Sequence, residues 1–406
     1  MFADQLLKDL PNPEAELLVH CARLETSPAR TERIRLLVSS GLDWTRLLSL
    51  AQRHALIPLL YFHLNRSALD QSPPERLKEL RTRFQNNSAL NVLLTGEMVR
   101  LLDLFAQNQI AALPYKGPAI AVGIYGNLSL RQFADLDILV PETEVWRATD
   151  LLLNQGYQAH FVIPERKKST FLRLSYVRLF KRESDGTTVE LHWRLAPRFF
   201  GAAFETAKLW ENGRTIQVQG SNVRIPLVED FILMLCLHGA KDCWEKLEWV
   251  CGLAELVRSD VQIDWGKLFS GARQARCLKA VILGLLLARD LLEAPVPANV
   301  LESVATDGSL NLLAQQIVAR FFAEPSAPFS LAKRVSFHLK VKDSLPEKLR
   351  YCARLALTTT PVDWEMASLP QPVSFVYYPL RVFRLFKKYG WQSDQLAASN
   401  RSAGPV

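Results

Sequence analysis

Two aspartates separated by one residue interrupt an otherwise apolar segment, and this pattern constrains the fold most strongly. Asp135 and Asp137 open the run Asp-Leu-Asp-Ile-Leu-Val, which ends at Pro141. Successive side chains of a strand point to opposite faces, so both carboxylates leave one face while the intervening apolar residues pack into a core. Neighbouring carboxylates repel each other, and a divalent cation between them relieves that repulsion. The segment therefore predicts a strand with a metal-binding face.

A third acid lies on a second predicted strand. Residues 176–181 and 187–194 are expected to form a hairpin, because the Asp-Gly pair between them favours a tight turn. Glu190 has apolar neighbours on the returning strand and shares a face with His192. If this strand lies beside that of Asp135, Glu190 completes a three-carboxylate site, which can hold two metal ions for phosphoryl transfer. The simpler alternatives are a solvated edge-strand acid for Glu190 and a buried supporting histidine for His192.

Positive charge for a phosphate group is expected from residues that precede the first aspartate. An apolar run at 110–115 predicts a strand that ends in Lys116 and Gly117, and Pro118 suits the first turn of a following helix. Glycine lets the backbone approach a ligand closely, and a helix N-terminus favours an anion. Arg131, four residues before the first aspartate, could also reach a phosphate. The alternative for Lys116 is a plain cap on the strand end.

The C-terminal half adds one further candidate. His238 and Lys241 are three residues apart on a predicted helix and share a face. From that face Lys241 could contact a triphosphate, although helix packing explains the pair more simply. A basic, aromatic segment near the C-terminus could touch RNA or a membrane, with a solvated helix face as the favoured interpretation.

Helical periodicity and proline positions divide the chain into four parts. We expect an N-terminal helical region at 1–85, a catalytic core at 86–222, a helical domain at 223–325, and a basic helical segment with a tail at 326–406. Strands are few and confined to the core, so the expected fold class is α+β. The helices expected around the first boundary cover residues 75–84 and 86–107.

The composition fits a folded protein of a reducing compartment. Apolar residues make up 49% of the 406 residues and charged residues 22%, which is the balance of a globular protein. The six cysteines form no CxxC pair and are expected as free thiols. A net charge of +8 mildly favours acidic partners. No apolar run approaches the roughly 20 residues that span a bilayer, and the N-terminus does not resemble a signal peptide. We therefore expect a soluble, cytoplasmic protein without a transmembrane segment.

Taken together, these motifs resemble the uncharacterised bacterial nucleotidyltransferase family of the polymerase β-like superfamily. Looser similarity extends over about residues 45 to 295. The chain departs from the wider superfamily in having Lys-Gly where Gly-Ser or Gly-Gly is usual, and a glutamate as the third acid. The motifs that carry the resemblance are Tyr115-Lys116-Gly117, Tyr125-Gly126, Leu130-Arg131, Asp135-Leu136-Asp137-Ile138-Leu139-Val140 and Val189-Glu190-Leu191-His192-Trp193.

The resemblance implies transfer of a nucleoside monophosphate from a nucleoside triphosphate to a hydroxyl acceptor, with release of pyrophosphate. Asp135 and Asp137 would be ligands of Mg²⁺ or Mn²⁺, and Glu190 would bind one metal and align or deprotonate the acceptor. ATP is the expected donor. The implied fold is a small mixed sheet of nucleotidyltransferase topology, flanked by N-terminal helices and a C-terminal helical bundle.

Two other functions remain open at this stage. One is a non-catalytic nucleotide-binding or antitoxin-like protein, against which the intact set of acids argues. The other is an RNA-end nucleotidyltransferase, which needs a strong basic track with stacking aromatics. Because the positive charge is modest and dispersed, an unidentified protein or small-molecule acceptor is favoured over RNA.

Overall fold

The computed structural model describes residues 10–202, 204, 206–259, 261–302, 308–323 and 330–357. Much of the basic segment expected at 326–406 thus lies outside the described residues. No described helix is both long enough and apolar enough to cross a lipid bilayer. The described part of the basic segment forms α17 (Leu331–Lys340) and α18 (Leu345–Leu357).

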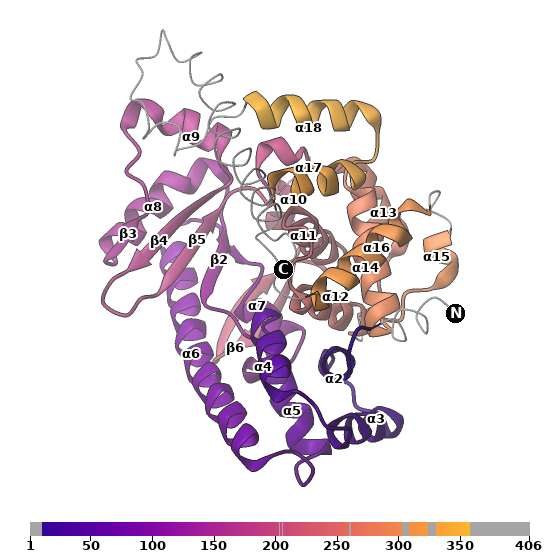
Figure 1. Cartoon of the computed structure of the whole chain (residues 1–406). Coiled ribbons are helices and arrows are strands. Elements are labelled where there is room, and N and C mark those ends of the chain that lie inside the picture. Colours follow the sequence, from indigo (N-terminus) through magenta and orange to yellow (C-terminus); the bar gives the residue numbers. More distant parts are fainter. Residues whose placement is uncertain are drawn as a thin grey trace, which may run out of the picture.

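Among the described residues, five strands form one mixed sheet in the order β1-β2-β5-β4-β3. β2 and β5 run parallel, and the other neighbouring strands are antiparallel. The expected α+β fold, a small mixed sheet set among helices, is confirmed (Figure 1). The strands are β1 (Leu113–Pro114), β2 (Asp135–Leu139), β3 (Tyr157–Ala159), β4 (Val177–Arg182) and β5 (Thr188–His192).

Local sequence explains several features of this sheet. Pro114 has no backbone N–H to donate and lies in β1, at the edge of the sheet. In β2 the apolar side chains of Leu136 and Ile138 are buried on the face opposite the aspartates. The predicted hairpin of β4 and β5 is confirmed, and the Asp185 carboxylate accepts a hydrogen bond from the Thr187 N–H in its turn.

The long helix α6 (Pro74–Gln107) replaces the two helices that were expected at 75–84 and 86–107. No glycine or proline lies between the two expected segments, so nothing interrupts the backbone hydrogen bonds there. Tertiary packing supports the junction, because the Phe84 ring contacts the ring of Tyr61 with centroids 4.9 Å apart. The helix passes through the expected boundary between the first two domains, and that division stays a prediction.

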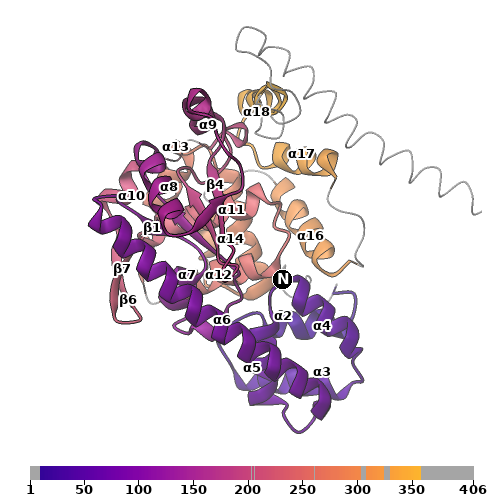
Figure 2. The same ribbon diagram turned by 90° about the vertical axis from the view of Figure 1, so that its left-hand side faces the viewer.

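Four described helices precede α6 and pack against one another, and the last of them contacts α6 (Figure 2). Side-chain caps set the starts of three of them: Asn12, Ser27 and Asp43 each accept a hydrogen bond from a backbone N–H of the first turn. These helices are α2 (Pro13–Cys21), α3 (Pro28–Ser39), α4 (Trp44–Arg53) and α5 (Ile57–Ser67).

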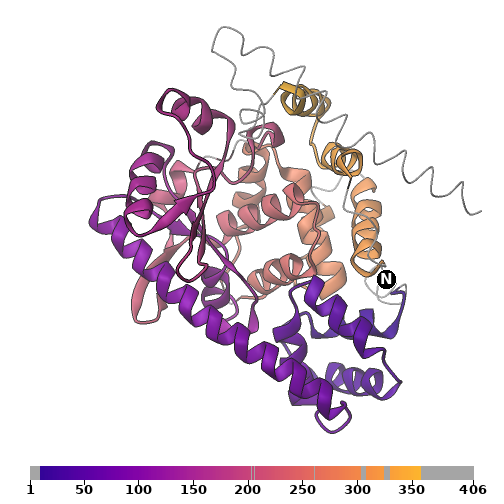
Figure 3. The ribbon, with the colours of Figure 1, turned by 60° about the vertical axis from the view of Figure 1, so that its left-hand side comes forward.

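A bundle of helices forms the C-terminal half, and the sheet lies between this bundle and α6 (Figure 3). The helix α14 is buried along nearly its whole length because it contacts α11, α12 and α16. The members of the bundle are α11 (Val228–Lys241), α12 (Leu247–Arg258), α13 (Trp265–Gln274), α14 (Leu278–Leu292), α15 (Ala298–Glu302) and α16 (Ser309–Phe322).

Shorter elements connect these layers. A separate antiparallel pair, which the sequence analysis did not anticipate, consists of β6 (Arg214–Val218) and β7 (Ser221–Ile225). It contacts β1 and α7 beside the sheet. The remaining elements are α7 (Pro118–Gly123), α8 (Val145–Asn154), α9 (Lys168–Leu174), α10 (Ala207–Glu211) and the 3-10 turns η1 (Leu128–Leu130), η2 (Glu142–Glu144), η3 (Glu165–Lys167) and η4 (Arg198–Phe200).

Candidate active site

The register of two parallel strands brings the predicted acids together. Asp137 of β2 is the direct partner of Glu190 of β5, and Leu139 is the partner of His192. Side chains paired in this way leave the same face of the sheet. Asp137, Glu190 and His192 each offer a ligand atom, and these atoms lie within 4.8 Å of one another. The two acidic strands thus lie side by side, which was the condition for a shared site, and a histidine joins the cluster.

Asp137 is the most enclosed of the acids, at 4% exposed. Its Oδ1 accepts from the Lys116 ammonium at 2.7 Å and lies 3.0 Å from Nε2 of His192. Burial by itself would raise the pKa of the Asp137 carboxyl, but Lys116 and the His192 contact outweigh it and hold the pKa well below its usual range. Asp137 is therefore a stable anion, and Lys116 is the cation that faces it.

His192 connects the two acids through a single ring nitrogen. Its Nε2 lies 3.1 Å from Oε2 of Glu190 as well as 3.0 Å from Asp137. The Tyr115 hydroxyl lies 3.3 Å from the ring nitrogens of His192, and the two rings meet edge to face with centroids 5.2 Å apart. Burial, followed by the charges of Asp137 and Glu190, raises the pKa of Tyr115 well above its usual value. Tyr115 therefore keeps its proton and fixes the orientation of the imidazole.

Asp135 lies on the same face of β2, two residues before Asp137, but outside the cluster that contains His192. Burial raises the pKa of Asp135 to about 6, with a further contribution from the negative charges of Asp137 and Glu190 and opposition from Lys116 and Arg131. Burial and the two neighbouring carboxylates together therefore favour the protonated form of Asp135.

The turn between β1 and α7 places Lys116 against the acids. Gly117 has a φ of +52°, a backbone region that favours glycine, and a Cβ there would come within 3.4 Å of the Asp135 carbonyl oxygen. The chain can therefore pass close to the start of β2 while the Lys116 side chain reaches Asp137. Both predicted residues lie at the site, and the ammonium of Lys116 pairs with a carboxylate.

Arg131 has a different environment from the one expected for a phosphate contact. It is buried, its Nε donates to Glu248 Oε1 of α12 at 2.5 Å, and its Nη1 donates to the Gly117 carbonyl at 3.1 Å. The carbonyl of Arg131 accepts from the amides of Asn87 and Asn91 on α6, at 3.0 and 2.7 Å. Arg131 thus ties the Gly117 turn to α6 and α12.

Asn87 and Asn91 were not among the predicted site residues. They lie four residues apart on one face of α6, and Asn91 is fully buried. A polar residue in the buried stripe of an amphipathic helix is the sequence signal that could have drawn attention to them.

Lys241 lies at the margin of the site. Its ammonium pairs with Asp242 at 2.7 Å and sits 5.5 Å from the centroid of the Tyr176 ring. The Tyr176 ring is in turn 6.0 Å from that of His192. Burial would lower the pKa of Lys241, but Tyr176 and Asp242 outweigh it and the pKa is raised. The C-terminal end of α11 therefore adds a permanent positive charge beside the acidic face.

Comparison with known proteins identifies a family that the chain matches. The model of a family described as uncharacterised nucleotidyltransferase matches residues 40–293, more than half of the chain. The matched region contains the whole five-stranded sheet and every candidate residue named above. No curated protein and no solved structure matches the chain.

Proposed function

The chain belongs to the uncharacterised nucleotidyltransferase family, and we propose that it transfers a nucleoside monophosphate from a nucleoside triphosphate to a hydroxyl acceptor. ATP is the proposed donor, and the acceptor is a protein or a small molecule. The observation that carries the proposal is the pairing of Asp137 with Glu190 on adjacent parallel strands, together with His192. Such a convergence of acids on one sheet face has a direct use in phosphoryl transfer.

The donor set fits a divalent cation. Asp137 and Glu190 supply carboxylate oxygens and His192 supplies an imidazole nitrogen, all within 4.8 Å of one another. Asp135 lies beside this set, and after burial the negative charges of Asp137 and Glu190 raise its pKa, a repulsion that a cation would relieve. Carboxylates suit both Mg²⁺ and Mn²⁺, which are the proposed ions. When bound, the ion supplies positive charge that polarises the reacting phosphate and stabilises the leaving oxygen.

The remaining steps are assigned to side chains of the chain itself. The acceptor oxygen attacks the α-phosphorus, the bond from that phosphorus to the bridging oxygen breaks, and pyrophosphate leaves. Glu190 is only partly buried, and its Oε2 is oriented by His192, so its carboxylate is placed to align the acceptor hydroxyl and take its proton. Lys116 and Lys241 provide positive charge on the phosphate side.

The test is a transfer assay with each of the four α-labelled ribonucleoside triphosphates, Mg²⁺ or Mn²⁺, and a lysate of the source cells. Asp137→Asn and Glu190→Gln should lower label transfer by roughly a hundredfold or more, because each removes a charge from the proposed metal site. Glu183→Gln is the matched control, since this exposed acid lies in the turn of the same hairpin.

The assay also separates the alternatives. Label found on RNA would favour an RNA-end transferase. Metal-dependent nucleotide binding without transfer would favour the non-catalytic protein. Equal transfer by Asp137→Asn and the wild type would overturn the proposed site.

A further inference from the structure

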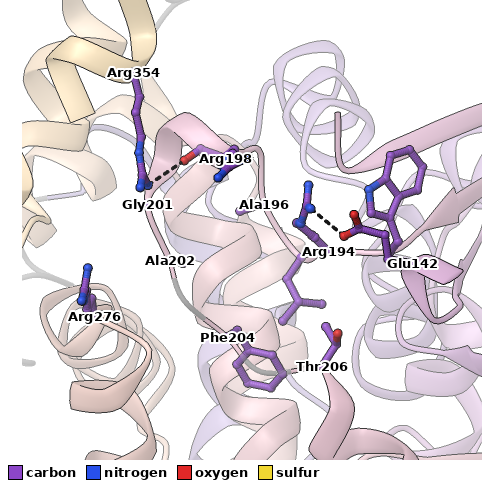
Figure 4. Close-up of a pocket in the computed structure, with 12 residues that line it drawn as sticks. Glu142, Arg194, Ala196, Arg198, Gly201, Ala202, Phe204, Thr206, Arg276 and Arg354 are labelled. Atoms are coloured by element: carbon purple, nitrogen blue, oxygen red, sulfur yellow. Dashed lines mark hydrogen bonds and ion pairs between the residues drawn. The ribbon is translucent and has the colours of Figure 1, made fainter. Parts of the chain in front are cut away.

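A cavity of about 370 Å³ lies beyond the ends of the two acidic strands (Figure 4). Its wall includes Trp193 and Arg194, which directly follow the last residue of β5, and Glu142, which lies three residues after the last residue of β2. Ligands of sheets with parallel strands bind at the carboxyl ends of those strands. The cavity therefore occupies the edge of the sheet where a second substrate would approach.

Four arginines from separate segments line this cavity. Arg194 follows β5, Arg198 begins η4, Arg276 lies between α13 and α14, and Arg354 belongs to α18. Glu142 is the only acid among the described lining residues, and it pairs with Arg194 at 2.5 Å. Three guanidinium groups are thus left without an acidic partner in the described wall.

The contacts of these three arginines leave donors for a ligand. Arg354 Nη1 donates to the Arg198 carbonyl at 3.3 Å, and Arg198 Nη1 donates weakly to the Arg173 carbonyl at 3.5 Å. Within the described part of the chain, the side chain of Arg276 forms no hydrogen bond or ion pair. A guanidinium carries five N–H donors, so single carbonyl contacts satisfy little of its capacity.

Electrostatics and shape point to the same kind of ligand. Burial lowers the pKa of Arg354, and the neighbouring charges of Arg198, Arg350 and Arg276 lower it further. An oxyanion between these groups would remove that repulsion and accept paired hydrogen bonds. Figure 4 places Phe204 at one end of the cavity, away from Arg354, so an apolar wall adjoins the cationic one.

We propose that this cavity binds a small phosphorylated molecule through Arg198, Arg276 and Arg354, and that this molecule is the acceptor of the transfer. The second part rests on the proposed nucleotidyl transfer. The volume is at the small end of the range for ligand sites, which fits a metabolite of the size of a sugar phosphate better than a polymer. The phosphate binds the arginines, and a hydroxyl of the same molecule is directed back along the strands toward Asp137 and Glu190.

Binding is tested on the full chain by isothermal titration calorimetry with ribose 5-phosphate, inorganic phosphate and ribose as probes. We expect both phosphate-containing probes to bind and ribose not to.

Arg276→Gln and the Arg276→Gln/Arg354→Gln pair should weaken phosphate binding about tenfold or more, since each removes a charge-assisted hydrogen bond. Arg273→Gln is the matched control, because Arg273 is exposed on the last turn of α13, three residues before Arg276, and does not line the cavity. Equal phosphate affinity in all variants, or none in the wild type, overturns the site.

The role as acceptor site is tested separately in the labelled-transfer assay. The Arg276→Gln/Arg354→Gln variant should lose most transfer to lysate molecules that pass a small-pore filter, while keeping its affinity for the nucleotide. Transfer at the wild-type rate overturns the acceptor role. If the wild type binds phosphate but shows no transfer at all, the proposed function is refuted and the anion site stands. Asp137→Asn should bind phosphate as the wild type does, because Asp137 does not line the cavity. Arg276→Gln alone guards against misfolding, because that side chain has no described partner to lose.

Discussion

At the residue level, the contacts of His192 set the chemistry of the acidic cluster. One nitrogen of its ring lies within 3.1 Å of both Asp137 and Glu190, and the Tyr115 hydroxyl fixes the orientation of the ring. Imidazole nitrogen is a good ligand for Mn²⁺ and later transition metals, whereas Mg²⁺ prefers oxygen. A cluster of two carboxylates and one histidine therefore favours Mn²⁺ over Mg²⁺ more than three carboxylates would.

We predict that His192→Asn lowers the affinity for Mn²⁺ by about tenfold or more and changes the affinity for Mg²⁺ much less. The measurement is calorimetric titration of each metal, with the electron paramagnetic resonance of free Mn²⁺ as a second readout. His160→Asn, on an exposed histidine at the end of β3, is the control. The same loss for both ions would show that His192 only positions the acids.

At the level of elements, a buried ion pair holds the loops of the site to the helical bundle. Arg131 and Glu248 are both buried, and Arg131 also donates to the Gly117 carbonyl. Arg131 precedes β2, whereas Glu248 lies in the first turn of α12. The pair therefore connects the turn before α7 and the start of β2 with the C-terminal bundle.

Replacing only one partner of this pair should lower the free energy of unfolding more than replacing both. Arg131→Met should lower the free energy of unfolding by about 3–5 kcal/mol, because the Glu248 charge is then buried without a partner. The double variant Arg131→Met/Glu248→Met should recover much of that loss. Urea denaturation measures both. The exposed pair of Lys181 and Glu183 gives the control, since its removal should cost less than about 1 kcal/mol. Additive losses in the double variant would contradict this account.

At the level of the whole molecule, buried neutral histidines join segments that are distant in sequence. His54 accepts the Leu247 N–H at Nδ1, which leaves Nε2 protonated to donate to the Phe321 carbonyl. Nε2 of His63 likewise contacts the Arg23 carbonyl. Burial lowers the pKa of both histidines to about 4. His54 in particular ties the N-terminal helices to α12 and α16, and it can do so only as a neutral ring.

Acid should therefore lower the stability of the folded state at a pH above that at which ordinary carboxylates titrate. Because the pKa of each histidine is lower in the folded state, the unfolded chain binds more protons between about pH 6.5 and 4, and stability falls as the pH drops through that window. Each histidine should contribute a loss of about 2 kcal/mol at pH 5 relative to pH 7.5. Urea midpoints across this range measure the loss.

The variant that isolates this effect is His63→Gln, which keeps a donor near the Arg23 carbonyl but does not titrate. It should be less stable than the wild type at pH 7.5 and lose less stability on acidification. His160→Gln should follow the wild type, because that side chain is exposed. A wild-type stability that does not change between pH 7.5 and 5 would refute the prediction.

The sequence by itself determined the features that depend on near neighbours. The alternation of Asp135, Leu136 and Asp137 fixed which side chains share a face, because side-chain direction in a strand follows from the backbone geometry. The Asp-Gly turn of the hairpin and the cap at Asp43 were likewise predictable from local hydrogen bonding. The same local rules predicted the helical character of α6 but placed a break in it that the structure does not have.

Only the tertiary structure decided which distant groups meet. It put Asp137 opposite Glu190 in a parallel pair, paired Arg131 with Glu248 across 117 positions of sequence, and gathered arginines from four segments around one cavity. No local pattern encodes these contacts, because strand register and helix docking minimise the free energy of the whole core. The residue types of the site could therefore be predicted from the sequence, whereas their partners follow from the packing of elements far apart along the chain.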